Sequence, residues 1–155
     1  MKTLVVCYSY TGNNRKLAKE VSNILKAEIV ELHDWLLKLP ILPLYFVSGI
    51  YTIFRKSTQI NYIKKNLDKY GRIIILSPVW FLRLPPAVRS FIAQNRKYAN
   101  IFSLCLVCSG GVKYAKQIND DFKEMTGIRC SKLLLISRKD FKHCRYYLPL
   151  NEFIK

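Results

Sequence analysis

The sequence predicts an α/β domain built on a doubly wound, five-stranded parallel sheet. Four short runs rich in Val, Ile and Leu show no alternation of polar and apolar residues, which is typical of strands buried on both faces. These runs are Thr3–Cys7, Arg72–Leu76, Ile101–Val107 and Leu133–Ile136. A fifth, weaker segment at Ala27–Leu32 contains Glu28 and Glu31, and we interpret it as an outer strand. Helical patterns separate the strands, and this alternation favours parallel pairing with right-handed crossovers.

Apolar residues recur at helical spacing between the expected strands. The expected helices are Arg15–Lys26, a segment from Ile60 to Tyr70 that ends at Gly71, a short helix over Val88–Ile92 that begins at Pro85–Pro86, and a longer one over Val112–Met125 that ends at Gly127. Proline suits a first helical turn and glycine suits the residue after a helix, so these positions mark the helix ends. Few residues follow the last strand, and Pro149 interrupts them, so the final helix must be short or displaced.

Length and composition indicate one globular domain over residues 1–155. Half of the residues are hydrophobic and 23% are charged, which excludes a disordered or collagen-like chain. Lys and Arg number 26 against 10 Asp and Glu, so the net charge is +16. Such a field attracts nucleic acid, anionic lipid, acidic proteins and phosphorylated cofactors, and it does not distinguish among them.

The five cysteines predict free thiols in a reducing, cytoplasmic environment, because no leader peptide is recognisable at the N-terminus. Cys105 and Cys108 have the spacing of a redox or metal pair. Cys105 lies on the expected strand Ile101–Val107 and Cys108 lies at its end, however, and residues three apart on a strand point to opposite faces, so we interpret them as core residues. The two histidines, His33 and His143, are far apart in the chain, and no metal site is expected.

Ligands of doubly wound sheets bind beyond the carboxyl ends of the strands. The loop after the first strand consists of Ser9, Tyr10, Thr11, Gly12, Asn13 and Asn14. Hydroxyl and amide side chains around a glycine, followed by a helix N-terminus, suit a phosphate group. An ordinary helix cap would explain only one of these polar residues. The glycine spacings of nucleoside triphosphate and dinucleotide loops are absent from the sequence, which argues against those ligands.

This loop resembles the flavodoxin signature S-x-T-G-N-T, which wraps the phosphate of FMN, and it departs from it only at Asn14. Ile73–Phe81 is similar to the strand and loop that lie against the flavin ring, and Ser109–Gly111 is similar to the third flavin loop. The resemblance spans roughly residues 1–138 in the expected order. It implies a flavodoxin-like fold with strand order 2-1-3-4-5 and FMN as the cofactor.

The second and third loops supply the residues expected around the flavin ring. These are Pro78, Val79, Trp80, Phe81, Leu82 and Arg83 in the second loop, and Ser109, Gly110, Gly111 and Tyr114 in the third. A flat ring stacks on aromatic side chains and accepts hydrogen bonds from exposed backbone N–H groups. Arg83 is open to two interpretations: a cation beside the flavin, which would raise the reduction potential, or a solvated charge.

The segment Leu39–Lys56 is longer than an ordinary connection and is uncharged from Leu39 to Phe54. It is too short to span a bilayer, and Pro40 and Pro43 would interrupt it. Four interpretations remain open for this segment: a helix packed on the domain, a lid over the flavin, a dimer surface, or an interfacial helix that makes peripheral contact with anionic lipid.

The leading functional prediction is an FMN-binding redox protein that transfers electrons through its flavin, with no catalytic side chain of its own. An NAD(P)H-dependent reductase acting on a quinone-like acceptor is the alternative enzyme. A nucleic-acid-binding domain and a flavin-free interaction module are the alternatives of another class, although no motif for specific nucleic acid recognition is present. The expected partner is an acidic redox protein or a small-molecule acceptor.

Overall fold

The computed structural model contains one sheet of five parallel strands in the order β2-β1-β3-β4-β5. It describes residues 2–61, 63 and 65–155. The strands are β1 (Thr3–Cys7), β2 (Glu28–Glu31), β3 (Arg72–Pro78), β4 (Phe102–Cys108) and β5 (Lys132–Ser137). Each lies within two residues of its predicted bounds, and the order confirms the prediction.

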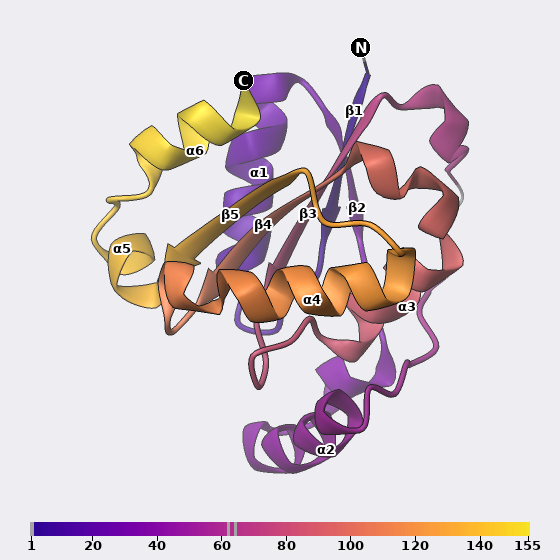
Figure 1. Ribbon diagram of the computed structural model, residues 1–155. Helices are drawn as coiled ribbons and strands as arrows, with labels where there is room; N and C mark the ends of the chain where they lie inside the picture. The colour runs from indigo at the N-terminus through magenta and orange to yellow at the C-terminus, as the bar shows by residue number, and fades with distance from the viewer. Residues whose placement is uncertain (1, 62, 64) are drawn as a thin grey trace.

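Helices cover both faces of the sheet (Figure 1). They are α1 (Asn13–Leu25), α2 (Ile41–Ile53), α3 (Pro86–Gln94), α4 (Ala115–Thr126), α5 (Arg138–Lys142) and α6 (Tyr147–Ile154). Because successive strand residues point to opposite faces, the sheet contributes to two separate cores. Val5 and Cys7 pack with α1 and α6, whereas Leu4 and Val6 pack with α3 and α4.

Three expectations about the helices are confirmed: the start of α3, the end of α4 and the shortness of the last helix. Pro86 is the first residue of α3, and Gly127, at a left-handed φ of 83°, ends α4. The last helix, α6, has only eight residues and includes Pro149. The start of α4 differs from the prediction, because Gly111–Tyr114 form a 3-10 turn before the helix begins at Ala115.

The helix expected from Ile60 to Tyr70 is wrong. The residues described there are mostly irregular, with one 3-10 turn at Leu67–Lys69, and part of the stretch lies outside the described residues. Asn61 explains the difference. Its side chain accepts a hydrogen bond from the His33 N–H at 2.7 Å and donates to the Glu31 carbonyl at 3.0 Å. These bonds hold the segment beside the end of β2 and override the helical spacing of its apolar residues.

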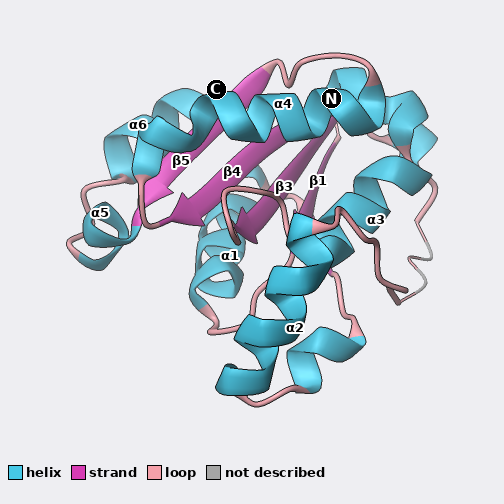
Figure 2. Cartoon of the chain, turned by 60° about the horizontal axis from the view of Figure 1, so that its bottom comes forward, coloured by secondary structure: helices cyan, strands magenta, loops and turns pink. Residues whose placement is uncertain are grey.

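The long connection after β2 contains α2, which stands off the carboxyl edge of the sheet (Figures 1 and 2). The two ends of this segment meet at a buried cluster that we call the neck: Tyr8, Asp34, Thr58 and Ser90. The Asp34 carboxylate accepts from the Tyr8 hydroxyl at 3.0 Å and from the Thr58 hydroxyl at 2.8 Å. Ser90 of α3 donates to the Thr58 carbonyl at 2.6 Å. Among the described helices, none is long and apolar enough to cross a membrane.

Candidate functional site

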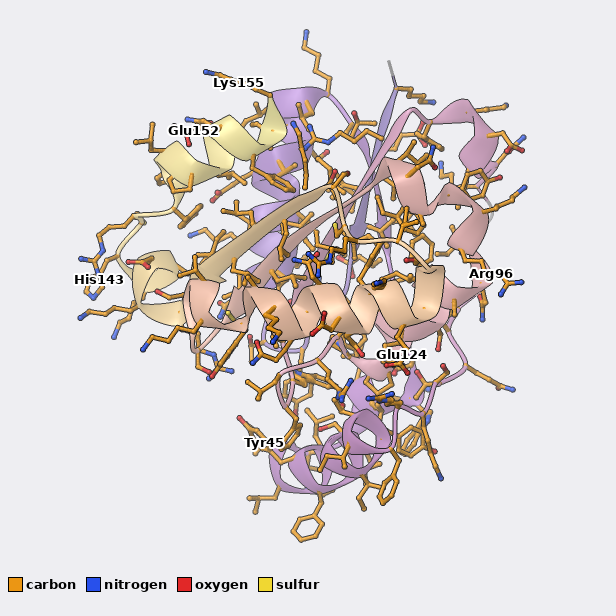
Figure 3. All side chains as sticks on the ribbon, in the orientation of Figure 1. Tyr45, Arg96, Glu124, His143, Glu152 and Lys155 are labelled. Carbon is orange, nitrogen blue, oxygen red and sulfur yellow. The ribbon has the colours of Figure 1, made fainter. Side chains whose placement is uncertain are left out.

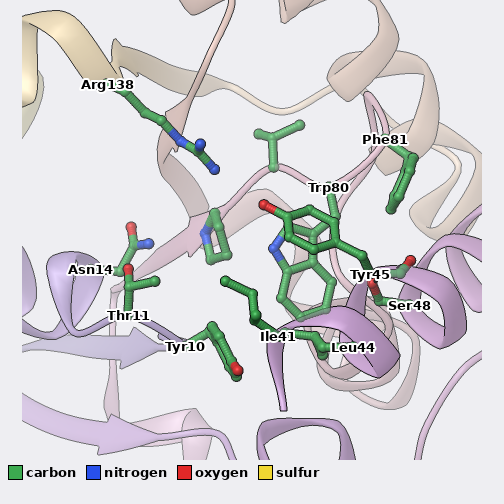
Figure 4. Close-up of a pocket in the computed structure, with 12 residues that line it drawn as sticks. Tyr10, Thr11, Asn14, Ile41, Leu44, Tyr45, Ser48, Trp80, Phe81 and Arg138 are labelled. Carbon is green, nitrogen blue, oxygen red and sulfur yellow. Dashed lines mark hydrogen bonds between the residues drawn. The ribbon is translucent and has the colours of Figure 1, made fainter. Parts of the chain in front are cut away.

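An open pocket of about 750 Å³, counting the part that reaches solvent, lies at the carboxyl edge of the sheet (Figure 4). The β1–α1 loop, the β3–α3 loop, α2 and the first residue of α5 form its walls. The lining residues are Tyr10, Thr11, Asn14, Ile41, Leu44, Tyr45, Ser48, Pro78, Val79, Trp80, Phe81 and Arg138. Seven of them belong to the first two predicted loops. The pocket therefore lies where ligands of parallel sheets bind.

The β1–α1 loop forms a polar end of the pocket. Gly12 has a φ of 90°, and its N–H donates to the Ser9 hydroxyl at 3.1 Å. This turn leads directly into α1, whose first N–H groups have no partner within the helix. Asn14 in that first turn is only 4% exposed, yet its Oδ1 has no hydrogen-bond partner in the described structure. Thr11 and Asn14 lie together on this wall (Figure 4).

Arg138 faces this polar end from the opposite side, and the sequence analysis missed it. It follows β5 directly, and its guanidinium extends into the pocket across from Thr11 and Asn14 (Figure 4). It forms no ion pair with any residue that the structure describes. The sequence did contain a signal, because the residue after every strand of a parallel sheet reaches the same edge.

The other end of the pocket is largely apolar and aromatic. Pro78, Val79 and Trp80 leave the end of β3, and the Trp80 ring meets Tyr8 edge to face, with centroids 5.6 Å apart. Ile41, Leu44 and Tyr45 of α2 form the facing wall. The start of α2 is tied to the first loop, because the Tyr10 hydroxyl donates to the Leu39 carbonyl at 3.0 Å. This arrangement offers a flat organic group apolar contacts from two sides.

The loop after β3 turns sharply at Phe81 and Leu82. Trp80 and Arg83 exchange two backbone hydrogen bonds of 3.0 and 2.9 Å, and the two residues between them have φ values of 47° and 63°. Residues other than glycine rarely adopt this left-handed backbone conformation, which costs of order 1 kcal/mol or more for each residue. The Phe81 ring packs on Gly49 of α2, where an added Cβ would lie 3.1 Å from it. Strained turns of this kind are concentrated at functional sites.

Arg83 lies outside the pocket lining and has a partner within the protein. Its guanidinium is 3.1 Å from the Asp121 carboxylate of α4. Asp121 is buried and also accepts from Arg89 and from the Leu84 N–H. This cluster joins the β3–α3 loop to α4, and the interpretation of Arg83 as a freely solvated charge does not match its geometry. A role beside the flavin stays a prediction.

Eight further predicted residues lie outside the pocket lining as the structure presents it. They are Ser9, Gly12, Asn13, Leu82, Ser109, Gly110, Gly111 and Tyr114. In the third loop, the Tyr114 ring lies against Gly110, and its hydroxyl is 3.4 Å from the Ser109 hydroxyl. The Tyr114 ring therefore covers the backbone that was expected to face a ligand. Direct binding by these eight residues stays a prediction.

The cysteines do not contribute to the pocket. Cys105 and Cys108 pack in different cores on opposite faces of the sheet, which confirms their interpretation as core residues. Burial raises the pKa of the Cys7 and Cys105 thiols to about 12, so both stay protonated near neutral pH. All five cysteines are free, and the described residues contain no group of three or more metal-ligating side chains.

Solved structures share this architecture. A flavoprotein from Lactobacillus acidophilus in complex with FMN superposes with a TM-score of 0.70 at 20% identity, covering 99% of both chains. A candidate flavoprotein from Bacteroides eggerthii gives 0.69 at 16% identity, covering 96% of both chains. A flavodoxin, WrbA-like protein from Agrobacterium tumefaciens gives 0.52 at 14% identity, covering 94% of this chain and 91% of that one.

Together with the strand order, these likenesses show that the chain has a flavodoxin-like fold, as the resemblance of its loops implied. No protein-family model and no curated protein sequence matches the chain. At identities of this level, the structural likeness establishes the fold alone.

Proposed function

We propose that the chain binds FMN in this pocket and transfers electrons through the flavin. The observation that carries the proposal is Asn14, a buried amide whose oxygen has no partner, at the start of α1 and in the pocket wall. A buried acceptor without a partner is costly, and a ligand hydroxyl that donates to the Asn14 Oδ1, such as one on the ribityl chain of FMN, would remove that cost. The solved flavoprotein from Lactobacillus acidophilus, which has the same fold, contains FMN.

The residues present fit the two chemically different ends of FMN. Thr11, the side-chain NH2 group of Asn14 and the free N–H groups of the first turn of α1 would donate to the phosphate, and Arg138 would add a positive charge opposite them. Trp80 and Tyr45 would lie along the flavin ring at the apolar end. When bound, the flavin supplies the exchange of electrons, while these side chains position it and exclude water from its apolar faces.

A flavin-dependent reductase that uses NAD(P)H and a quinone-like acceptor is the second candidate. The apolar wall from α2 favours it, because Ile41 and Leu44 extend the pocket beyond a phosphate cradle and one aromatic face. Steady oxidation of NAD(P)H by the FMN-loaded protein, accelerated by a soluble quinone, would identify the reductase. Flavin reduction by an acidic redox protein alone would identify an electron carrier.

The charge of +16 supports an acidic partner for electron transfer. With so many cations around it, the reduced, anionic flavin should be stabilised, so we expect a comparatively high potential for its formation. Potentiometric titration of the FMN-loaded protein tests this, and a very low second potential would contradict it.

The first experiment is a titration of the purified protein with FMN, followed by flavin fluorescence and the visible spectrum. We expect quenching and shifted absorbance bands for the natural chain. Arg138→Gln should weaken FMN binding by about tenfold, because it removes one charge-assisted contact to the phosphate. Lys139→Gln is the matched control, since this neighbour is exposed and does not line the pocket.

Riboflavin, which lacks the phosphate, separates the two ends of the pocket. Arg138→Gln should leave riboflavin binding unchanged, whereas Trp80→Ala should weaken both ligands. Equal losses for FMN and riboflavin in Arg138→Gln would refute the placement of the phosphate. A natural chain that fails to quench FMN at any concentration would refute the proposed function itself.

A further inference from the structure

Helix α2 packs on the protein with its small and polar side and exposes its large apolar side chains. Its buried residues are Leu44, Ser48, Gly49 and Thr52, so three of the four are small or polar. Its outward side carries the largest apolar side chains, with Leu42 78% exposed and Phe46 80% exposed. Side chains of this helix project away from the body of the molecule around the labelled Tyr45 (Figure 3). An ordinary surface helix has the opposite arrangement.

Four exposed apolar residues of α2 form one continuous stripe, which we call the α2 stripe: Leu42, Phe46, Ile50 and Ile53. Their spacing of four, four and three residues places them on one side of the helix. Ile41 and Tyr45 are also about half exposed, but they line the pocket. Phe54 continues the stripe beyond the helix end and is also exposed. A monomeric soluble protein rarely exposes so many large apolar side chains together, so the stripe marks an interaction surface.

Positive charge surrounds the α2 stripe. From Leu39 to Phe54 the chain has no charged residue, whereas Lys38 precedes this stretch and Arg55 and Lys56 follow it. Arg55 is ion-paired with Glu124 of α4 at 2.8 Å, whereas Lys38 and Lys56 form no ion pair with any residue that the structure describes. Two further exposed lysines follow strands of the sheet: Lys16 near the start of α1, and Lys113 in the 3-10 turn after β4. With a net charge of +16, the whole molecule favours an anionic surface as its partner.

We propose that the α2 stripe inserts into the interface of an anionic lipid bilayer. Leu42, Phe46, Ile50 and Ile53 would enter the boundary between headgroups and acyl chains, while Lys38 and Lys56, near the two ends of the helix, pair with lipid phosphates. The proposal is independent of FMN. If the pocket does hold a flavin, this orientation brings the α2 wall of the pocket to the membrane surface, where apolar electron acceptors dissolve.

A bilayer fits the stripe better than a protein surface does. Protein interfaces carry about one hydrogen bond for every 100–200 Å², and the stripe has no hydrogen-bonding side chain. A second copy of the chain would bring another net charge of +16 to the same contact. Acyl chains require no hydrogen bonds, and anionic headgroups attract the surrounding cations.

Sedimentation with vesicles of phosphatidylcholine, with and without phosphatidylglycerol, tests the proposal directly. We expect binding to the anionic vesicles and much weaker binding to the neutral ones. Leu42→Asp and Phe46→Asp should each reduce the partition coefficient by about tenfold or more, because each removes a large apolar group from the interface. All variants should keep the far-ultraviolet circular dichroism spectrum of the natural chain.

Leu148→Asp is the matched control. Leu148 is 71% exposed on α6, which lies far from α2 in both views (Figures 1 and 2), and its replacement changes the net charge equally. This variant should reduce binding by less than about twofold. Equal losses in all three variants would show that charge alone drives binding and would overturn the proposal.

Two other results would also overturn it. The first is a natural chain that does not sediment with anionic vesicles. The second is a dimer in analytical ultracentrifugation that Leu42→Asp converts to a monomer, because the stripe would then bind a second copy. None of these readouts involves flavin, so a failure here leaves the proposed function standing, and a failure of FMN binding leaves this proposal standing.

Discussion

Helices α1 and α2 have the same length of 13 residues and opposite relations to the rest of the protein. Helix α1 lies on the sheet and buries Leu17, Ala18 and Val21 in the apolar core. Helix α2 lies beyond the edge of the sheet, and of its buried residues Leu44, Ser48, Gly49 and Thr52 only Leu44 is large and apolar. The difference shows that the hydrophobicity of a helix does not by itself determine which side is buried. The elements that lie next to the helix determine it, and α2 has no sheet face beside it.

The two helices are consequently held by different forces. Helix α1 is stabilised by removal of its apolar face from water, which is the largest favourable contribution to folding. The segment containing α2 is held by the hydrogen bonds of the neck and by contacts with the β3–α3 loop, such as Phe81 on Gly49. Substitutions in the two regions should therefore have effects of different size and origin.

The largest contrast is expected between two leucines. Leu17→Ala on α1 should lower the free energy of unfolding by about 3 kcal/mol, because it leaves a cavity in the core. Leu42→Ala on α2 should change it by less than about 0.5 kcal/mol, because that side chain is exposed. Urea denaturation monitored by circular dichroism compares the two. Similar losses would mean that α2 is covered in solution.

A smaller effect is expected at the neck. Asp34→Ala removes the acceptor of two buried hydroxyls, those of Tyr8 and Thr58, and should cost about 2 kcal/mol. The same denaturation experiment measures it, with Asp34→Asn as the control that keeps an oxygen acceptor. A loss of less than about 0.5 kcal/mol would mean that the hydroxyls find water and that the neck does not secure α2.

The pH dependence of the neck should be unusual for a carboxylate. Burial raises the pKa of Asp34 above its ordinary value, despite hydrogen bonds from Thr58 and Tyr8 that lower it. Between the unfolded and folded pKa values the native state binds more protons, so this group adds stability as the pH falls. Relative to Asp34→Asn, the natural chain should gain stability on acidification from neutral pH toward about pH 4. Parallel stability curves for the two proteins would contradict this.

The smallest effect is expected at the turn that contacts α2. Leu82→Gly relieves one positive φ and should raise the free energy of unfolding by up to about 1 kcal/mol. Phe81→Gly relieves the neighbouring angle but also removes the ring that packs on Gly49, so its net gain should be smaller. Thermal unfolding of both variants makes the comparison, and equal gains would show that the Phe81 contact contributes nothing.

The sheet could be predicted from the sequence because each buried strand is a continuous apolar run between turn-forming residues. The first two pocket loops were predicted because their residues follow those strands directly. Neither the buried side of α2 nor the irregular course around Ile60 could be predicted from periodicity. The first depends on packing at the edge of the sheet, and the second depends on hydrogen bonds of Asn61 to residues about 30 positions away.

The positions of the two arginines, Arg83 and Arg138, also depend on contacts between residues far apart in the sequence. Arg83 follows Trp80 and Phe81 in the sequence, but its partner Asp121 lies 38 residues away on α4. Arg138 follows the fifth strand, outside the three loops that the sequence analysis assigns to the site. Applying the rule of the carboxyl edge to the fifth strand as well would have found it.

The hydrogen bond between Asp34 and Thr58 joins residues that are 24 positions apart, so the chain leaves and re-enters the body of the protein at nearly one point. Opening of the intervening segment would break the neck, the Tyr10–Leu39 hydrogen bond and the Phe81–Gly49 contact, but no hydrogen bond of the sheet. Its amide protons should exchange with solvent through this local opening, at a much lower free energy than those of β1 and β3, which require global unfolding. A ligand that bridges the α2 wall and the strand ends should slow this exchange in the segment and leave that of the sheet unchanged.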